Sequence, residues 1–150
     1  MGDRAPDFEL PDDRGGTCRL GQMVAAGPVV VYFYPAAMTP GCTREGCHFR
    51  DLAPQYAAVG AQRVGISPDP VPRLRRFSEE QGFDFPLLSD AGGVVARAYG
   101  ARRRLGPLPT RRVTFVIGGD GVVVEVIRSE FRFAKHGDAA LGALRDQRYG

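Results

Sequence analysis

The sequence lacks any long apolar run. The apolar segment Pro28–Ala37, which Met38 extends by one residue, is far shorter than the roughly 20 residues that a membrane-spanning helix needs. It also lacks the pattern of a secretory signal, a basic tip followed by roughly 7 to 15 apolar residues, because Met1–Glu9 mixes charged residues with proline. We therefore expect a cytoplasmic protein that does not interact with a membrane.

Cysteine is scarce, and the excess of positive charge is small. Three cysteines among 150 residues do not provide a disulfide framework, and in a reducing compartment they indicate a reactive thiol instead. Twenty basic and 17 acidic side chains give a formal net charge of +3, which is weak support for a polyanionic partner. The arginines at 102–104 and 111 belong to no recognised nucleic-acid-binding module. We predict a solvated basic loop at 102–109 and no nucleic-acid partner.

The composition is that of a folded domain. With 43% hydrophobic and 25% charged residues, the chain differs from disordered sequences, which combine low hydrophobicity with high net charge. A chain of this length buries roughly 68 to 70% of its unfolded surface, so it requires neither a metal nor a disulfide to fold. Because no internal repeat or linker-like tract divides the sequence, we predict one domain over residues 1–150.

Segments with strand patterns alternate with segments with helix patterns. The strands are predicted over Pro28–Tyr34, Arg63–Ser67, Pro86–Ser89, Val113–Ile117 and Val122–Ile127. The helices are predicted over Pro40–Gly60, Pro72–Gln81, Val94–Tyr99 and Lys135–Arg148. In the first helix, Pro54 predicts a kink near Asp51.

The order of these segments predicts the fold class. The first strand is a continuous β-branched and aromatic run, which is typical of a central strand covered on both faces. The Asp120-Gly121 step between the last two strands predicts a hairpin. We predict an α/β, thioredoxin-like fold whose central mixed sheet is flanked by helices, with parallel strands early and an antiparallel pair late.

Cys42 falls in the first turn of the helix that follows the central strand. Thr39 and Pro40 form a cap-then-proline start signal just before it. Free N–H groups and the helix dipole favour an anion at this position, so we expect the Cys42 thiol to be ionised at neutral pH. Ionisation alone raises the rate of a thiol reaction by at most ~30-fold, so further donors must hold the electrophile.

The Thr39 hydroxyl is a candidate for such a donor, and a plain helix cap is the alternative interpretation. For Cys42 the alternative is a small buried apolar side chain, a common state of free cysteine. Cys18 has no partner motif, and we interpret it as a structural or incidental thiol.

Cys47 follows Cys42 by five residues. On one α-helix this spacing separates the two Cα atoms by ~8.7 Å and places them on different faces, whereas a disulfide needs roughly 4.4 to 6.8 Å. The two cysteines can therefore join only if the helix unwinds locally, and Gly46 and Pro54 both make unwinding easier. We hypothesise that this helix has a folded, reduced form and an opened, disulfide form.

The segment Phe33–Cys47 resembles the active-site segment of the peroxiredoxin Q group, also called bacterioferritin comigratory proteins. Pro35, Thr39 and Cys42 meet the family pattern P-x-x-x-T-x-x-C. Arg112, at the start of the strand R-V-T-F-V-I, matches the arginine of the family's active site. Lesser matches extend the resemblance over almost the whole chain.

This resemblance implies a thioredoxin-fold peroxidase that reduces hydrogen peroxide and organic hydroperoxides without a cofactor or a metal. In the family the first cysteine becomes a sulfenic acid, and the resemblance assigns that role to Cys42. It assigns the resolving role to Cys47, through an intramolecular disulfide that thioredoxin or a similar dithiol donor reduces. Resolution within one chain favours a monomer.

The resemblance also implies roles for the residues around the sulfur. Thr39, Arg112 and the N–H groups of the first turn hold both peroxide oxygens. Pro35 shields the sulfur from water, Pro40 begins the helix, and Glu45 orients the arginine.

Other function classes have weaker support from the sequence. A thiol-disulfide oxidoreductase would ordinarily need a C-x-x-C motif, and none occurs. A redox sensor whose helix opens on oxidation stays open as an added role. Zinc binding by Cys42, Cys47, His48 and His136 lacks the spacing of a closed tetrahedral site, so we predict no metal.

Overall fold

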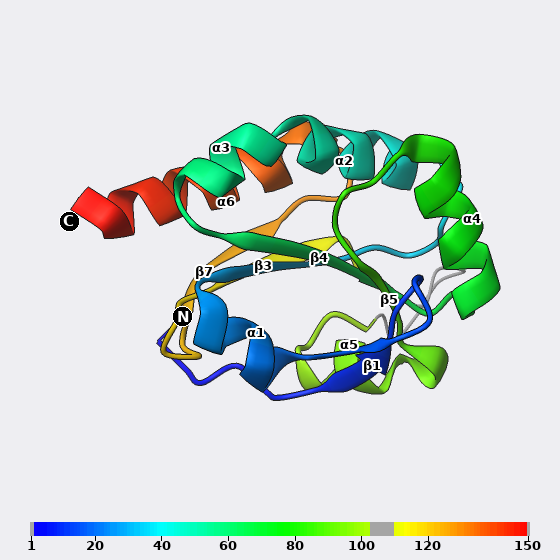
Figure 1. Cartoon of the computed structure of the whole chain (residues 1–150), viewed down its shortest axis with the longest axis horizontal. Coiled ribbons are helices and arrows are strands. Elements are labelled where there is room, and N and C mark those ends of the chain that lie inside the picture. Colours follow the sequence, from blue (N-terminus) through cyan, green and yellow to red (C-terminus); the bar gives the residue numbers. More distant parts are fainter. Residues whose placement is uncertain (1, 103–109, 150) are drawn as a thin grey trace.

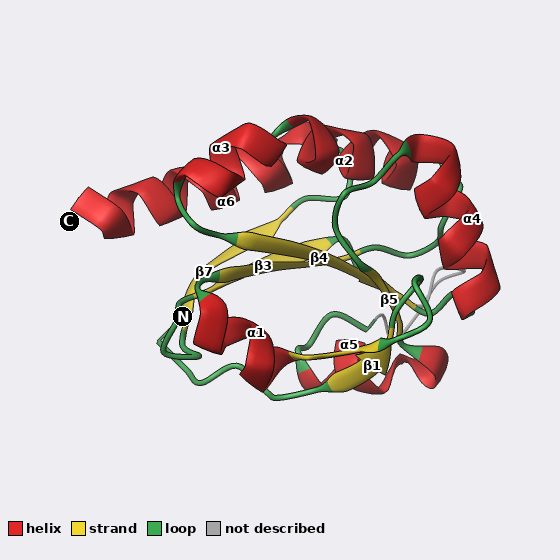
Figure 2. Ribbon diagram, viewed as in Figure 1, coloured by secondary structure: helices red, strands yellow, loops and turns green. Residues whose placement is uncertain are grey.

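A five-stranded mixed sheet with helices on both faces forms the centre of the computed structural model, which describes residues 2–102 and 110–149 (Figures 1 and 2). The sheet contains β3 (Val29–Phe33), β4 (Gln62–Ser67), β5 (Leu87–Ser89), β6 (Val113–Ile117) and β7 (Val123–Arg128). The strand order is β5-β4-β3-β6-β7. Strands β3, β4 and β5 are parallel to their neighbours in that group, whereas β6 pairs antiparallel with β3 and β7. The predicted mixed sheet and its central strand are confirmed.

The helices form two layers, one on each side of this sheet. The layer with Cys42 and Cys47 contains α2 (Pro40–Asp51), α3 (Ala53–Ala58), α4 (Val71–Gln81) and α6 (Phe133–Tyr149). The opposite layer contains the hairpin of β1 (Glu9–Pro11) and β2 (Thr17–Arg19), α1 (Leu20–Ala26), a single 3-10 turn at Ala91–Gly93, and α5 (Val94–Ala98). No helix in the described ranges is long and apolar enough to cross a membrane.

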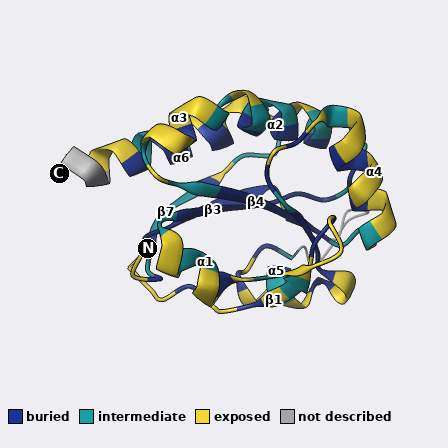
Figure 3. Ribbon diagram, in the orientation of Figure 1, coloured by how far each residue is buried: buried dark blue, intermediate teal, exposed yellow. Residues whose placement is uncertain are grey.

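Strand β3 separates two apolar cores, and Figure 3 shows its ribbon in the colour of buried residues at the centre of the molecule. Its alternate side chains Val30 and Tyr32 pack into the core under α2 and α6, whereas Val29, Val31 and Phe33 pack into the other core. All five residues of the strand are buried. This burial on both faces explains why the sequence of β3 is continuously apolar instead of alternating.

The predicted helix over Pro40–Gly60 is divided into two helices. The break is at Leu52, whose φ of −89° and ψ of 9° are not helical. Pro54 causes it, because proline has no N–H to donate to the carbonyl four residues earlier. The predicted kink near Asp51 is therefore confirmed, and α2 is a separate helix that carries both Cys42 and Cys47.

One helix near the N-terminus, α1, is missing from the sequence prediction. The segment around Cys18 is hairpin-like in sequence, and β1 and β2 form an antiparallel pair there. Helix α1, in contrast, has no side-chain cap and no charged residue in its first or last turn. Only Leu20 of its seven residues is buried, so its apolar pattern is weak. Packing, not local sequence, determines this helix.

Contacts between aromatic rings connect the central strand to α2. The Tyr32 ring of β3 stacks on Phe49 of α2 with a centroid distance of 4.4 Å and an angle of 11° between planes. On the other side, Tyr32 lies over Gly65 of β4, where an added Cβ would be 2.7 Å from Tyr32 Cζ and 3.0 Å from Leu87 Cδ2. Only a residue without a side chain leaves room for the ring that supports α2.

We predict that Gly65→Ala lowers the free energy of unfolding by about 2 kcal/mol, because the methyl group overpacks the core beside Tyr32. Gly142→Ala is the matched control, since an added Cβ there meets nothing within 4 Å and alanine favours α6 by up to about 1 kcal/mol. Urea unfolding of both variants measures the difference. Equal stability of the two variants would contradict the close packing at Gly65.

Candidate active site

The loop between β3 and α2 places Cys42 in the first helical turn. Pro40 is the first residue of α2, and Cys42 is 1% exposed. Just before the helix, Met38 has a φ of 67°, a left-handed conformation that non-glycine residues seldom adopt. Asp69 and Arg73 hold this turn in place.

Both residues bind the backbone of Ala37. Its N–H donates to Asp69 Oδ2 at 2.7 Å, and its carbonyl accepts from Arg73 Nη2 at 3.1 Å. Arg73 also pairs with Asp69, with 3.2 Å between Nε and Oδ1. These two residues are not predicted from the sequence, in which they stand in a proline-rich segment directly after β4.

Thr39 occupies the cap position of α2, but its hydroxyl does not cap the helix. The backbone at Thr39 is extended, as at an N-cap, and the side chain makes no cap hydrogen bond. Instead the hydroxyl donates to the carbonyl of Ala36 at 2.8 Å. The interpretation of Thr39 as a plain side-chain cap is therefore wrong, and Thr39 lines a pocket together with Arg112.

Arg112 reaches Cys42 from 70 residues farther along the chain. Its Nη2 lies 3.5 Å from Cys42 Sγ, and its Nη1 donates to Glu45 Oε1 at 2.7 Å. Its Nε donates to the carbonyl of Glu130 at 3.3 Å, and its guanidinium lies 4.8 Å from the centre of the Phe133 ring. Burial lowers the pKa of Arg112. The neighbouring Glu45 and Cys42 raise it by more, so the pKa of Arg112 is raised overall. The side chain is therefore a permanent cation beside the sulfur.

Glu45 is fully buried and pairs with Arg112. Burial raises the pKa of Glu45 above the usual range of a carboxyl group, whereas the adjacent Arg112 cation lowers it and favours the carboxylate. The second carboxyl oxygen, Oε2, has no hydrogen-bond partner among the described residues and lies 3.7 Å from His136 Nδ1. Glu45 is thus in contact with Arg112 at one oxygen and next to a buried imidazole at the other.

His136 connects α6 to the segments on either side of this ion pair. Its Nε2 donates to the carbonyl of Ser129 at 2.7 Å, and its Nδ1 lies 2.7 Å from Thr114 Oγ1. A carbonyl only accepts, so in the neutral ring Nδ1 accepts from the Thr114 hydroxyl. Burial lowers the pKa of His136, which favours this neutral form.

The two other cysteines have different surroundings from Cys42. Cys47 is partly buried on α2, and its Sγ lies 3.4 Å from Gln81 Oε1. Both helical cysteines are free thiols in this structure.

Cys18 Sγ lies 3.7 Å from Asp12 Oδ2, and burial together with this acid raises the pKa of Cys18 to about 11. A thiol of that kind is seldom ionised, so Cys18 is a poor nucleophile.

A pocket of about 310 Å³ opens beside Arg112. Its lining consists of Pro35, Ala36, Thr39, Gly41, Arg112, Glu130, Phe131 and Phe133. An added Cβ at Gly41 would lie 2.8 Å from the Phe133 ring and 3.2 Å from Arg112 Nη2, so glycine is needed there. Apart from Thr39, Arg112 and Glu130, the lining residues are apolar, and Phe131 is 86% exposed. A lining that combines polar donors with aromatic rings suits a small polar group attached to an apolar one.

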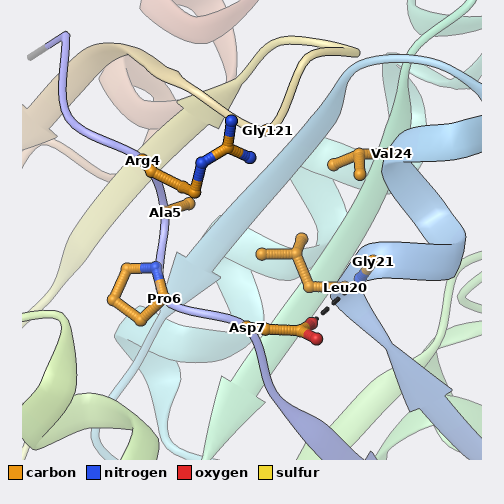
Figure 4. Close-up of a pocket in the computed structure, with 8 residues that line it drawn as sticks. All are labelled: Arg4, Ala5, Pro6, Asp7, Leu20, Gly21, Val24 and Gly121. Carbon is orange, nitrogen blue, oxygen red and sulfur yellow. Dashed lines mark hydrogen bonds between the residues drawn. The ribbon is translucent and has the colours of Figure 1, made fainter.

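A second pocket, of about 450 Å³, lies between the N-terminal segment and α1 (Figure 4). Its acidic side chain, Asp7, accepts hydrogen bonds from the N–H groups of Phe8 and Gly21 and pairs with Arg19. Because Asp7 already has these partners, the pocket offers no comparable reactive group.

The structure gives little support to zinc binding, the alternative considered from the sequence. Both histidines considered as ligands have other partners: His48 Nε2 lies 2.7 Å from Asp138 Oδ1, and His136 Nε2 lies 2.7 Å from the carbonyl of Ser129. Within residues 2–102 and 110–149, no three His, Cys, Asp or Glu side chains gather as a metal site would require. Most of the basic loop predicted at 102–109, residues 103–109, lies outside the described residues. Its first residue, Arg102, donates a hydrogen bond to the carbonyl of Gly92.

Comparisons with known proteins agree with this geometry. The model of the AhpC/TSA family matches residues 1–126. A protein named as a peroxiredoxin in Mycobacterium tuberculosis is 56% identical over 99% of this chain and 98% of its own length. Chloroplastic peroxiredoxin Q of Sedum lineare is 40% identical over 96% of this chain and 77% of its own.

Solved structures show the same fold. The peroxidoxin BcpB of Mycobacterium tuberculosis superposes with a TM-score of 0.92 at 55% identity, covering 97% of this chain and 96% of that one. The bacterioferritin comigratory protein of Xanthomonas campestris, whose structures address alkyl peroxide reduction, superposes with a TM-score of 0.85 at 36% identity. That match covers 93% of this chain and 91% of the other. The predicted thioredoxin-like fold is thereby confirmed.

We predict that acidification destabilises the protein partly through His136. Its pKa is lowered in the folded state, so the unfolded chain, in which histidine titrates near 6.5, takes up the proton first. The resulting stability is present above about pH 6.5 and is lost as the pH falls toward the folded-state pKa. Unfolding temperatures measured between about pH 7.5 and 5.5 should fall more steeply for the wild type than for His136→Gln. Parallel slopes would show that His136 is not held neutral.

Proposed function

Because the chain belongs to the AhpC/TSA family, the peroxiredoxins, it is a thiol-dependent peroxidase, and we propose that Cys42 is the thiol that attacks the peroxide. The observation that supports this assignment most strongly is the 3.5 Å distance between Arg112 Nη2 and Cys42 Sγ. Of the three cysteines, only Cys42 combines a first-turn position with a neighbouring guanidinium. Both features stabilise a thiolate.

In the first step, the Cys42 thiolate attacks the terminal oxygen of a hydroperoxide. A sulfur–oxygen bond forms, the oxygen–oxygen bond breaks, and its electron pair leaves on the other oxygen, which takes up a proton to become water or an alcohol. Arg112 stabilises the negative charge as it moves from sulfur to the leaving oxygen. The Thr39 hydroxyl joins it by turning from the Ala36 carbonyl toward the bound peroxide, and Cys42 becomes a sulfenic acid.

Three further residues support this step. Pro35 lies in the pocket wall beside Arg112 and keeps water from the sulfur. Pro40 begins α2 and lacks the N–H that would have no helical partner there. Glu45 orients Arg112 through the 2.7 Å ion pair. The step uses no cofactor and no metal.

In the second step, Cys47 resolves the sulfenic acid. Its thiol attacks Cys42 sulfur, a disulfide forms, and the hydroxyl leaves as water. Because both cysteines lie on the continuous helix α2, this step requires the helix to open between them. The hydrogen bond between Cys47 and Gln81 must break at the same time.

In the third step, thioredoxin or a similar dithiol donor reduces the disulfide. One donor thiol attacks the disulfide, and the second releases the reduced enzyme, so that the donor leaves oxidised. Since one chain of a single domain contains both cysteines, the cycle needs no second subunit, and we assign it to a monomer. The reducing cytoplasm is the compartment in which such donors maintain thiols.

The mass of the protein after one equivalent of hydrogen peroxide tests this sequence of steps. We expect the wild type to lose two hydrogens, Cys47→Ser to gain one oxygen on Cys42, and Cys42→Ser to remain unchanged. Cys18→Ser is the matched control and should behave as the wild type does. Continued peroxide consumption with a dithiol donor separates this enzyme from a sensor, which reacts once and stops. A disulfide that forms without Cys42 would refute the assignment.

The aromatic side chains that line the pocket indicate activity toward organic hydroperoxides. Its 310 Å³ far exceeds the space that hydrogen peroxide fills, and Phe131 offers an exposed ring to an apolar group. We predict that Phe131→Ser lowers kcat/KM for cumene hydroperoxide about fivefold, which corresponds to about 1 kcal/mol of lost apolar contact. For hydrogen peroxide kcat/KM should change less than about twofold, because this substrate has no apolar group. Equal losses for both substrates would contradict the role of Phe131.

A further inference from the structure

Phe83 packs against α2 at the residue before Cys47. An added Cβ at Gly46 would lie 2.5 Å from Phe83 Cζ, and 3.1 and 3.2 Å from two other ring atoms. No real Cβ fits at such a distance, so the edge of the ring touches the helix backbone itself. Gly46 thus does more than lower helix propensity, because it provides the space that the ring fills.

The ring of Phe83 is fixed by its neighbours. It makes an edge contact with Phe77 of α4 at 5.0 Å and stacks on Phe85 at 5.1 Å, measured between ring centres. Phe83 is 7% exposed. It therefore presses on Gly46 as part of an aromatic cluster and not as a loose side chain.

The end of α4 holds the same part of α2 by hydrogen bonds. Gln81 Oε1 lies 3.4 Å from Cys47 Sγ, and the Gln81 carbonyl accepts from Arg50 Nη1 at 2.6 Å. Gln81 and Phe83 flank Gly82, which has a left-handed φ of 66° and ends α4. One short segment, 81–83, thus contacts α2 at Gly46, Cys47 and Arg50.

We propose that Phe83 is a positioning residue that holds Cys47 in its helical place and thereby sets the rate of disulfide formation. This inference rests on the proposed function, since it takes Cys47 as the thiol that condenses with the Cys42 sulfenic acid and releases water. The contact between Phe83 and Gly46 exists only while α2 is helical. Weakening the contact should favour the opened helix and leave the attack of Cys42 on peroxide unaffected.

The test follows the mass of the protein at short times after one equivalent of hydrogen peroxide. The gain of one oxygen reports the first step, and the later loss of water from that species reports the disulfide step. In Phe83→Leu we expect the second step to be about tenfold faster, which is about 1.4 kcal/mol, with the first step unchanged. Phe77→Leu is the matched control, because Phe77 belongs to the same cluster without being among the near neighbours of Gly46. Its second step should stay within about twofold of the wild type.

Gly46→Ala, made in the wild-type and in the Phe83→Leu background, provides a second test. In the wild-type background the methyl group displaces the ring, so the disulfide step should be faster. In the Phe83→Leu background the same methyl group meets no ring edge and only strengthens the helix, so the step should be slower. This change of sign is specific to a contact between positions 46 and 83.

The possible outcomes distinguish a failure of the proposed function from a failure of the role inferred for Phe83. If the wild type gains an oxygen and never forms the disulfide between Cys42 and Cys47, the proposed function and the inference both fail. If the disulfide forms but Phe83→Leu and Phe77→Leu change its rate equally, only the inference fails. A slower step with Gly46→Ala in both backgrounds would likewise overturn it.

Discussion

The buried ion pair between Arg112 and Glu45 is the interaction on which the rest of the site depends. A guanidinium loses its hydration inside a protein, and only close acceptors offset that loss. Glu45 accepts a hydrogen bond from Nη1 of Arg112, and the carbonyl of Glu130 accepts one from Nε. Because the guanidinium is planar and rigid, these two bonds direct its Nη2 at the Cys42 sulfur. Without the carboxylate, the cation would be buried with too few partners and would have no fixed direction.

Helix α2 must satisfy two opposite requirements. Its first turn has to stay formed, because the free N–H groups there favour a thiolate at Cys42. Farther along the same helix, the residues near Cys47 have to leave their helical positions before a disulfide can form. The helix is accordingly short, ends at Leu52 ahead of Pro54, and contains a glycine beside the resolving cysteine. Contacts from α4 then hold the helix closed at that glycine and at Cys47.

Much of the fold was predictable from local patterns. The run of apolar residues in β3 requires burial on both faces, and Pro40, Pro54 and Gly82 mark helix ends through the backbone alone. Helix α1 was not predictable, because its sequence has neither caps nor a strong apolar pattern. At Thr39 the local rule placed the helix start correctly and the hydroxyl wrongly, since the hydroxyl donates to the carbonyl of Ala36 and makes no cap hydrogen bond.

The sequence by itself determined which residue types the site contains and where its helix begins, because spacing along the chain sets the position of Cys42 within the first turn. It also determined that Cys42 and Cys47 are too far apart on a helix to be joined. Only the tertiary structure decided what surrounds that turn. Asp69, Glu130, His136 and Phe83 come from other elements, and their directions depend on how the sheet and helices pack. Contacts between distant segments follow from the packing of whole faces, for which no short pattern in the sequence is a guide.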